Sequence, residues 1–345
     1  MEKEKIYLCA FADKRLRLSA KRFTKQAKEM GVYSDIFVYN ESHLDRKFMN
    51  IFYDKIYTGG GISRGFGYWV WKPYIILKTL ENLKDGEILQ YTDIGCHLNP
   101  KGVKRLYEYV SLANKSDTGI LCVINNRSFK YIAPVNDHPS ITYPILATEH
   151  PESHVSEGAA GYIIGKQFIK GSELGVLCYK ENEDGVNGIK PGQWTKGDLY
   201  DYFGVRQNER VLKTETLSSV IFIRKCDKSI EILKKWMQVY YDDFALVDDS
   251  PSKSANFPDF IEHRHDQSIW SILVALYDVP YVYYKEIYSP FNWDALKEYP
   301  IHAKRDRSYI TRTKYIKRII VRVLKKILTK DLYNKLKAVY KRFRA

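Results

Sequence analysis

Hydrophobic and polar residues along the first hundred positions predict strands and helices in alternation. Short apolar runs such as "KIYLCAF" and "ILQY" are typical of buried strands, and the segments between such runs have helical spacing. The predicted strands cover 5–11, 32–39, the residues that end in "DKIYT" and Ile88–Tyr91, and the predicted helices cover 16–30 and 68–83. This order indicates an α/β fold with a parallel sheet and helices on both faces.

The rest of the chain continues this order with longer polar connections. Helices are predicted at 101–113, at 227–241 and from "HRHDQ" onward, and strands at 119–124, 159–165, 216–225 and in "VPYVYYK". Segment 125–160 is expected to form long loops, and segment 180–215 is expected to contain loop and helix. We find no internal repeat and no low-complexity linker, so we expect one domain over 1–303 and a tail over 304–345.

The tail has a hydrophobic pattern of its own, which predicts basic amphipathic helices. The apolar positions on one face are Ile316, Ile319, Ile320, Val323, Leu324, Ile327 and Leu328, and then Leu332, Leu336, Val339, Tyr340 and Phe343. Helices of this kind lie in the headgroup region of anionic bilayers. A helix packed on the body and a nucleic-acid-binding segment are the alternatives. The apolar stripe favours the membrane, because phosphate binding needs no hydrophobic face.

Charge and cysteine content narrow the class of protein. The chain has 345 residues and a net charge of +14, and residues 304–345 hold 16 of its 55 Lys and Arg but 2 of its 41 Asp and Glu. The tail therefore carries the whole excess, and no nucleic acid is expected as a partner of the neutral body. The first residues do not form a secretory signal, no apolar run reaches 18 residues, and the five cysteines are scattered. These features favour a cytoplasmic protein with reduced thiols.

Candidate chemistry begins where the strand "ILQY" ends. Asp93 follows this strand directly, with Gly95 two residues later. Ligands of open α/β sheets gather outside the carboxyl ends of the strands, so Asp93 is expected to face a ligand. An aspartate that merely stabilises a turn is the alternative.

A glycine-rich stretch leads into a cluster of aromatic and basic residues, "RGFGYWVWK". Its candidates are Arg64, Tyr68, Trp69 and Lys72, and its glycine spacing is that of neither a dinucleotide fingerprint nor a phosphate-binding loop of the Walker type. Cations beside aromatic rings suit a phosphate and a sugar ring. Core packing of the tryptophans is the alternative.

Two further polar clusters stand near predicted helix starts. "EHRHDQSIW" groups Glu262, His263, His265, Asp266 and Gln267, more polar side chains than helix capping requires. A metallohydrolase would need additional ligands that have no recognisable spacing here.

"WTKGD" brings Trp194, Lys196 and Asp198 within five residues, a set that can stack on a sugar ring and bond its hydroxyls. A surface helix start is the equal alternative.

Taken in order, five segments resemble bacterial glycosyltransferases of capsule and lipopolysaccharide synthesis. They are "RGFGYWVWKPYIIL", "DGEILQYTDIGC", "WTKGD", "TETLSSVIFIRK" and "EHRHDQSIWSIL", and the resemblance covers roughly 5–305. It implies a GT-A-like fold, in which a Rossmann-type mixed, mostly parallel sheet flanked by helices binds a nucleotide sugar. The acceptor would bind the C-terminal half, where Trp194, Lys196, Asp198, Glu262, His263 and His265 are the expected contacts.

The same resemblance suggests how the donor diphosphate is neutralised. In GT-A enzymes a D-x-D after a strand holds a divalent metal, Mn²⁺ or Mg²⁺. Asp93 stands at the first acid and Gly95 at the second, and His302 is similar in place to the late metal-ligand histidine of related retaining galactosyltransferases. The charge could be neutralised by a metal on Asp93 and His302, or by Arg64 and Lys72.

The resemblance also implies roles at the donor sugar and the nucleotide. Asp266 and Gln267 are similar to the Asp-Gln pair that contacts the donor sugar beside its anomeric carbon, and with Asp93 they form the expected catalytic set. An inverting reaction would instead need a carboxylate base, for which Asp266, Asp198 and Glu262 are candidates. The donor-binding residues expected beside the nucleotide base are Phe11, Ala12 and Asp13.

The expected function is therefore a hexosyl transfer from a nucleotide-diphosphate sugar, with a UDP-hexose as the first expectation. The acceptor would be a glycan or lipid-linked glycan of a surface polysaccharide, and the tail would hold the enzyme on the inner face of the plasma membrane. Two alternatives are a nucleic-acid-binding protein that uses the basic tail and a catalytically inactive sugar-binding module.

Overall fold

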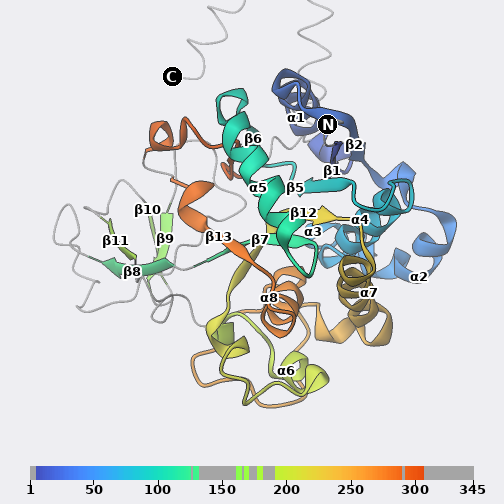
Figure 1. Cartoon of the computed structure of the whole chain (residues 1–345). Coiled ribbons are helices and arrows are strands. Elements are labelled where there is room, and N and C mark those ends of the chain that lie inside the picture. Colours follow the sequence, from blue (N-terminus) through green and yellow to red (C-terminus); the bar gives the residue numbers. More distant parts are fainter. Residues whose placement is uncertain are drawn as a thin grey trace, which may run out of the picture.

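The computed structural model describes residues 5–125, 127–131, 161–164, 167–170, 177–181, 191–289 and 292–306. Its centre is a six-stranded sheet with the order β13-β7-β12-β5-β1-β2 (Figure 1). The strands are β1 (Ile6–Phe11), β2 (Tyr33–Tyr39), β5 (Ile88–Thr92), β7 (Ile120–Ile124), β12 (Thr216–Arg224) and β13 (Tyr281–Tyr283). β12 runs antiparallel to β5 and β7, and the other neighbours are parallel. The predicted α/β class with a mixed, mostly parallel sheet is confirmed.

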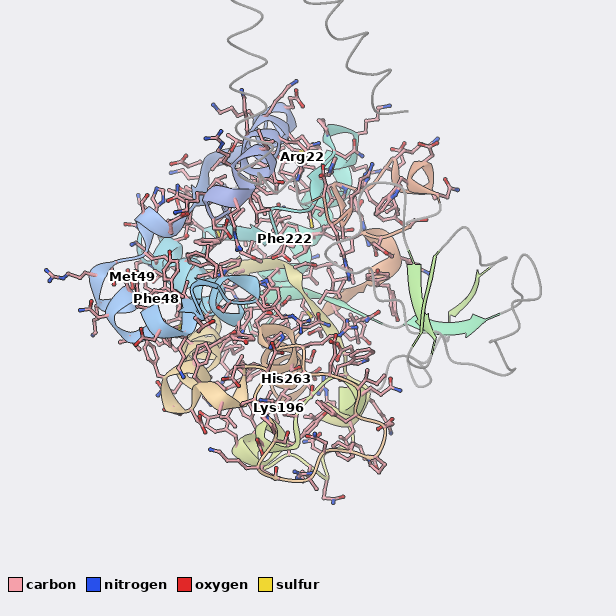
Figure 2. The ribbon with its side chains drawn as sticks, turned by 180° about the vertical axis from the view of Figure 1, so that it is seen from behind. Arg22, Phe48, Met49, Lys196, Phe222 and His263 are labelled. Carbon is pink, nitrogen blue, oxygen red and sulfur yellow. The ribbon has the colours of Figure 1, made fainter. Side chains whose placement is uncertain are left out.

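Helices cover both faces of this sheet because the strand residues alternate between two cores. Leu8 and Ala10 of β1 enter one core, whereas Cys9 and Phe11 enter the other. Figure 2 labels Phe222 in the first core and Phe48 in the second. The helices are α1 (Arg17–Met30), α2 (Arg46–Ile56), α3 (Gly65–Tyr68), α4 (Trp71–Glu81), α5 (Val103–Lys115), α6 (Gly197–Phe203), α7 (Asp227–Asp242) and α8 (Asp266–Leu276).

The two cores are built by different helices. Residues of α1 and α5 pack in the first core, and residues of α2, α4, α7 and α8 pack in the second. Trp236 of α7 and Trp270 of α8 are fully buried and stack with their ring centroids 4.7 Å apart. This stack packs α8 against α7, which matters because a candidate site residue begins α8.

One strand prediction is wrong. The residues up to "DKIYT" were expected to form a strand of the main sheet, but they end α2, and Tyr57–Thr58 then form the two-residue strand β3, which pairs with β4 (Gly61–Ile62) in a separate hairpin. Phe48, Phe52 and Ile56 are buried at a spacing of four residues, and the Asp45 side chain accepts from the Phe48 amide at 2.7 Å. This cap and spacing are the helix signal that the strand prediction missed.

The described chain also contains shorter elements. Among them are η1 (Lys14–Leu16), β6 (His97–Leu98), β8 (Arg127–Tyr131), β9 (Gly161–Ile164), β10 (Gln167–Lys170), β11 (Leu177–Glu181), η7 (Phe244–Leu246) and β14 (Ile301–His302). The predicted tail helices lie outside the described residues. Among the residues that are described, no helix combines the length and the apolar character that crossing a bilayer requires.

The pairing of β12 is irregular at the point that faces the candidate site. Its register with β7 shifts between Leu217 and Phe222, so Ser218 and Ser219 lie in a bulged stretch. The Ser219 carbonyl accepts from the Asp93 amide at 2.8 Å. This bulged stretch therefore lies against Asp93, the residue that follows β5.

Candidate functional site

A buried ammonium joins the two carboxylates that the sequence singled out. Lys72 lies in the first turn of α4 and its side chain is 1% exposed. Its Nζ contacts Asp93 Oδ1 at 3.5 Å and forms a short ion pair with Asp266 Oδ2. Asp93 follows β5 and Asp266 begins α8, so residues far apart in the sequence meet at one point.

Ser218 and Tyr91 complete this network. Ser218 Oγ donates to Asp266 Oδ2 at 2.7 Å, and both its Oγ and its carbonyl accept from Lys72 Nζ, at 3.0 and 3.2 Å. The Tyr91 hydroxyl donates to Asp93 Oδ1 at 2.5 Å. Neither residue was predicted to belong to the site, although the serines that interrupt the apolar strand "TLSSVIFI" were a visible signal.

Burial sets the electrostatics of the network. The pKa of Asp266 is raised by desolvation, while Lys72 and the Ser218 hydroxyl act to lower it. The pKa of Tyr91 is raised well above its ordinary value, first by burial and then by the charge of Asp93. Isolated buried charges are strongly unfavourable, so the ion pair and its hydrogen bonds are what keep these groups inside the protein.

His265 precedes Asp266 in a strained conformation. Its φ of 53° and ψ of −118° lie in a region that non-glycine residues rarely adopt, at a cost of about 1–3 kcal/mol. Its Nδ1 donates to the Val247 carbonyl at 2.6 Å, and its ring stacks on Trp69 at 5.5 Å and contacts Tyr68 at 5.0 Å. Burial and the nearby Arg64 lower the pKa of His265 to about 4, so the imidazole is neutral at pH 7.

The aromatic pair comes from a left-handed turn. Residues 65–69 all have positive φ, including the non-glycine residues Phe66, Tyr68 and Trp69. A Cβ on Gly65 would lie 2.4 Å from the Trp69 ring, so the indole covers this glycine. The glycines of this stretch therefore serve a tight turn that places Tyr68 and Trp69 against His265.

Arg64 lies at the edge of this group. Its side chain is 42% exposed and it contacts Asp249 at 3.4 Å and Glu262 at 3.8 Å. Asp249 also lies 3.6 Å from His265 Nε2. The predicted residues thus form two contact groups that meet at the His265–Asp266 peptide bond. Lys72, Asp93 and Asp266 form the first group, and the second contains Tyr68, Trp69, His263 and His265, with Arg64 and Glu262 linked through Asp249. Gln267 lies beside them, where its Nε2 donates to Glu215 Oε1 at 2.6 Å.

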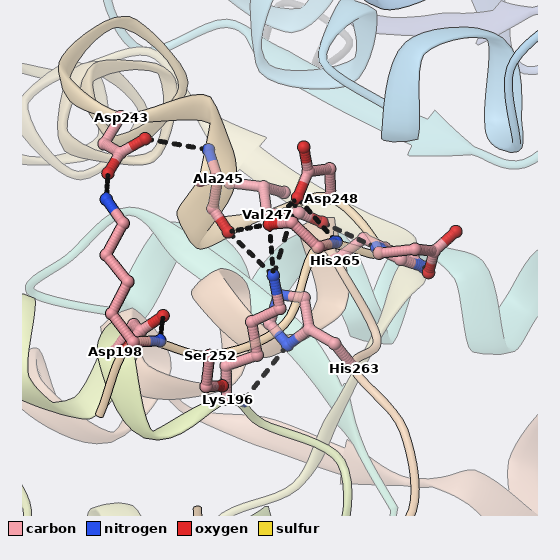
Figure 3. Close-up of polar contacts among 12 residues, drawn as sticks. Lys196, Asp198, Asp243, Ala245, Val247, Asp248, Ser252, His263 and His265 are labelled. Atoms are coloured by element: carbon pink, nitrogen blue, oxygen red, sulfur yellow. Dashed lines mark hydrogen bonds and ion pairs between the residues drawn. The ribbon is translucent and has the colours of Figure 1, made fainter. Parts of the chain in front are cut away.

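Three residues predicted to contact an acceptor sugar are packed against or hydrogen-bonded to other parts of the chain. Trp194 is fully buried with the Arg264 guanidinium 3.8 Å from its ring centre. Lys196 is 3% exposed and donates to the Ala245 carbonyl at 2.7 Å (Figure 3). Asp198 accepts from the Lys253 and Ser254 amides at 2.9 and 2.7 Å. Because these groups are bonded within the chain, we carry none of the three forward as a ligand contact.

Lys196 and His263 pack beside the loop that carries His265. His263 Nδ1 accepts from the Lys196 amide at 3.2 Å, and its ring lies 5.4 Å from that of His265 (Figure 3). Lys196 also contacts Asp248 at 3.5 Å, next to the Val247 carbonyl that His265 bonds. These contacts fix the loop that holds the strained His265, and we assign this supporting role to Lys196 and His263.

Two of the three predicted nucleotide-base residues, Ala12 and Asp13, line a pocket. Phe11 is buried and stacks on Trp71, with ring centres 4.2 Å apart. Asp13 is buried and paired with Arg15 at 2.7 Å. A pocket of about 390 Å³ opens where β1 and β2 end; it is lined by Ala12, Asp13, Lys14, Arg17, Ala20, Val38, Tyr39, Asn40, Glu41 and Ser42. The polar residues after β2, "NES", were a signal for this pocket that the sequence analysis did not use.

The residues expected to hold a divalent metal do not fit one. The Asp93 carboxylate faces the Lys72 ammonium, and an acid at position 95 would have its Cβ 3.3 Å from the Arg305 Cα. His302 Nε2 donates to the Leu296 carbonyl at 2.8 Å, and β14 pairs with β6. Within the described parts of the chain, no three His, Cys, Asp or Glu side chains are grouped as metal ligands. We therefore derive no step through a metal.

Comparisons with known proteins give distant structural likenesses. No family model matches the chain, and no curated protein matches it. A glycosyltransferase involved in glycosylation of the major capsid of PBCV-1 is 10% identical, with 88% of this chain and 97% of that chain covered and a TM-score of 0.39. Mouse xyloside xylosyltransferase 1 is 9% identical over 89% and 100% of the chains, with a TM-score of 0.38. The galactosyltransferase LgtC with donor and acceptor sugar analogues is 12% identical over 88% and 84%, with a TM-score of 0.29.

Proposed function

We propose that this chain is a glycosyltransferase that moves a sugar from a nucleotide-diphosphate donor to a glycan acceptor. The observation that carries the proposal is the meeting of Asp93 and Asp266 on the Lys72 ammonium at the carboxyl end of β5. Ligands of α/β sheets bind at this end of the strands. Carboxylates accept hydrogen bonds from sugar hydroxyls, and a network already bonded on its protein side presents them in fixed positions.

The two carboxylates would meet the donor in different ways in this proposal. Lys72 and Ser218 both bond Oδ2 of Asp266, which leaves Oδ1 as the oxygen that a donor hydroxyl would meet. Asp93 is 24% exposed, whereas Lys72 is buried, so Asp93 is the member of the network that substrate reaches first. Gln267 follows Asp266 on α8 and is the expected contact beside the reacting carbon.

The nucleotide would bind the pocket at the ends of β1 and β2. Lys14 and Arg17 line this pocket and supply positive charge for a diphosphate, while Asn40 and Glu41 offer groups that hydrogen-bond a ribose or a base. Ala12 and Asp13 of this pocket follow Phe11, which ends β1 and stacks on Trp71, and β1 pairs directly with β5, the strand that Asp93 follows. A UDP-hexose is the donor that we propose to test first.

We also propose that the acceptor is lipid-linked and that the basic tail holds the enzyme on an anionic membrane. Asp306, the last described residue, is held on α1, where its carbonyl accepts from Ser19 Oγ at 3.2 Å and from Arg22 at 3.3 Å. The exposed side of α1 carries Lys21, Lys25 and Lys28. The tail thus leaves the body beside a cationic helix, and each Lys or Arg near such a surface adds about 1 kcal/mol of binding.

The enzyme proposal is tested by following nucleotide release from UDP-hexoses by the purified chain, with and without added glycan acceptors. Wild-type protein is expected to release UDP from at least one donor, and Asp93→Asn to lower the rate at least about 100-fold, because it removes the charge that orients the sugar. Asp85→Asn, a 90% exposed aspartate, is the matched control and should retain full activity.

Two outcomes of this assay would contradict the proposal. Donor binding without release by wild-type protein would favour the inactive sugar-binding module, and full activity of Asp93→Asn would show that the carboxylate network is not the reacting site. Absence of any thermal shift with UDP, GDP or ADP would remove the nucleotide-binding premise.

A further inference from the structure

The Lys72 ammonium is surrounded by oxygen atoms in the manner of a bound cation. Its Nζ lies within 3.5 Å of four oxygens: Asp93 Oδ1, Asp266 Oδ2, Ser218 Oγ and the Ser218 carbonyl. The face of the Tyr91 ring lies 5.4 Å away. With a side chain only 1% exposed, Lys72 is shielded from solvent, so its positive charge acts on these groups almost unscreened.

The backbone at Gly95, two residues after Asp93, is packed against the chain at Arg305 and Asp306. The Asp306 amide donates to the Gly95 carbonyl at 2.9 Å, and the Gly95 Cβ position would be 3.3–3.5 Å from Arg305 Cα, Arg305 C and Asp306 N. Asp306 is itself fixed by His97 at 2.9 Å and by Arg22 at 3.3 Å. These contacts hold the returning chain against Gly95, so a second acid could enter there only if this backbone moved.

We propose that Lys72 is a positioning residue that replaces a divalent cation: its ammonium holds Asp93 and Asp266 together, and donor binding proceeds without added metal. The part of this inference that concerns the donor rests on the proposed function. The part that concerns metal binding rests on the geometry alone.

Charge balance explains why a second cation is not needed. The two carboxylates carry two negative charges, and the ammonium leaves one. A divalent cation on the same Asp93 oxygen would approach the Lys72 ammonium closely, and like charges at short range in a buried site repel strongly. The remaining charge on a donor diphosphate would be met by the exposed cations, Arg64 at the edge of the site and Lys14 and Arg17 in the pocket.

Manganese binding by full-length protein tests the geometry without any donor. Free Mn²⁺ measured by electron paramagnetic resonance during a titration is expected to show no stoichiometric site in wild-type protein. Lys72→Met removes the charge with similar side-chain length, and the two unneutralised carboxylates are expected to gain one Mn²⁺ site. Lys78→Met, on the same helix, is the matched control and should behave as wild type.

Calorimetry of UDP binding tests the functional part. Wild-type affinity is expected to agree within about twofold in EDTA and in Mn²⁺, since a factor of two is only about 0.4 kcal/mol. Lys72→Arg, which keeps the positive charge, should also bind UDP in EDTA, and it serves as the test if Lys72→Met does not fold.

The outcomes separate this inference from the proposed function. A stoichiometric Mn²⁺ site in wild-type protein, or UDP affinity that falls at least about tenfold in EDTA, overturns the inference and leaves glycosyl transfer standing. No binding of UDP, GDP or ADP under either condition overturns the proposed function, while the Mn²⁺ titrations still decide the role of Lys72.

Discussion

At the scale of single residues, the molecule places charged groups inside and satisfies them with short contacts. Lys72 and Asp266 are both almost fully buried, and their ion pair is supported by the Ser218 hydroxyl. Removing one partner of such a pair is more destabilising than the pair is stabilising, because a buried charge is left behind. Asp93, at 24% exposure, can be solvated and should be more tolerant.

Asp266→Asn is therefore expected to lower the free energy of unfolding by about 3–5 kcal/mol, and Asp93→Asn by less than about 2 kcal/mol. Urea denaturation at pH 7 measures both. Equal stability of the Asp266→Asn and wild-type proteins would show that the buried pair does not exist in solution.

The buried histidine predicts a specific loss of stability in mild acid. The pKa of His265 is about 4 in the folded protein, lowered first by burial, against about 6.5 when unfolded. Stability from the neutral imidazole is present above pH 6.5 and is lost as the pH falls toward 4. Between pH 8 and pH 5 this group should account for about 2 kcal/mol.

His265→Asn tests this, since its amide can still donate to the Val247 carbonyl but does not titrate. Its stability, measured by urea denaturation at pH 8, 6 and 5, should decline less than that of wild type by about 2 kcal/mol. His263, whose pKa is lowered first by burial and then by the neighbouring His265, is present in both proteins, so the comparison reports His265 together with its effect on His263. Parallel declines would contradict a buried neutral His265.

At the scale of elements, the left-handed turn at 65–69 connects α2 to α4 and carries the aromatic pair. Gly65→Ala places a Cβ against the Trp69 ring, whereas Gly59→Ala meets no atom within 4 Å at a similar φ of 54°. Both substitutions add backbone strain of about 1 kcal/mol, but the first must also displace the indole.

We expect Gly65→Ala to lower stability by at least about 2 kcal/mol and to shift the tryptophan fluorescence, because Trp69 leaves the His265 ring. Gly59→Ala should cost about 1 kcal/mol and leave the fluorescence unchanged. The same small effect for both variants would show that Trp69 is not fixed over Gly65.

The elements differ in how far the sequence could predict them. Strands such as β5 and β12 are mainly apolar, so the hydrophobic pattern placed them even though Gln90 interrupts β5 and Ser218 and Ser219 interrupt β12. α2 was missed because "DKIYT" reads as a strand end, although its buried residues follow a four-residue spacing. The left-handed turn could not be predicted, because positive φ at Phe66, Tyr68 and Trp69 is imposed by packing and contradicts their local preference.

At the scale of the whole molecule, the sequence led us to expect Asp93 and Asp266 near each other, because the resemblance implied that both contact the donor, and both carboxylates lie at the Lys72 ammonium. It could not show that Lys72 lies between them, because contacts of a long side chain depend on tertiary packing. The same limit applies to Trp194, whose stacking prediction did not include its complete burial. Local pattern identifies polar residues, whereas burial decides which of them remain available to a ligand.

Charge distribution at this scale predicts membrane binding. Full-length protein should co-sediment with vesicles that contain phosphatidylglycerol but not with pure phosphatidylcholine, and added salt should weaken the binding. Replacing Ile320 and Leu324 by Glu in the tail should reduce vesicle binding at least about tenfold. Replacing Lys21, Lys25 and Lys28 by Glu on α1 should reduce vesicle binding at least as much, because each lost cation removes about 1 kcal/mol of binding free energy.

The control replaces Lys228, Lys234 and Lys235 on α7, which changes the net charge equally away from the tail exit. Equal loss in this control would mean that net charge alone drives binding. Strong binding of DNA or RNA that depends on the tail, without vesicle binding, would favour the nucleic-acid alternative.

The most direct measurement of the central claim is an experimental structure of the protein with UDP or a UDP-hexose bound. The uridine is expected in the pocket beside Asp13 and Asn40, and the diphosphate or sugar within hydrogen-bonding distance of Asp93. Nucleotide bound elsewhere, for example in the hollow of about 360 Å³ between α4 and α7 that Tyr74 and Tyr241 line, with Asp93 untouched, would contradict the account.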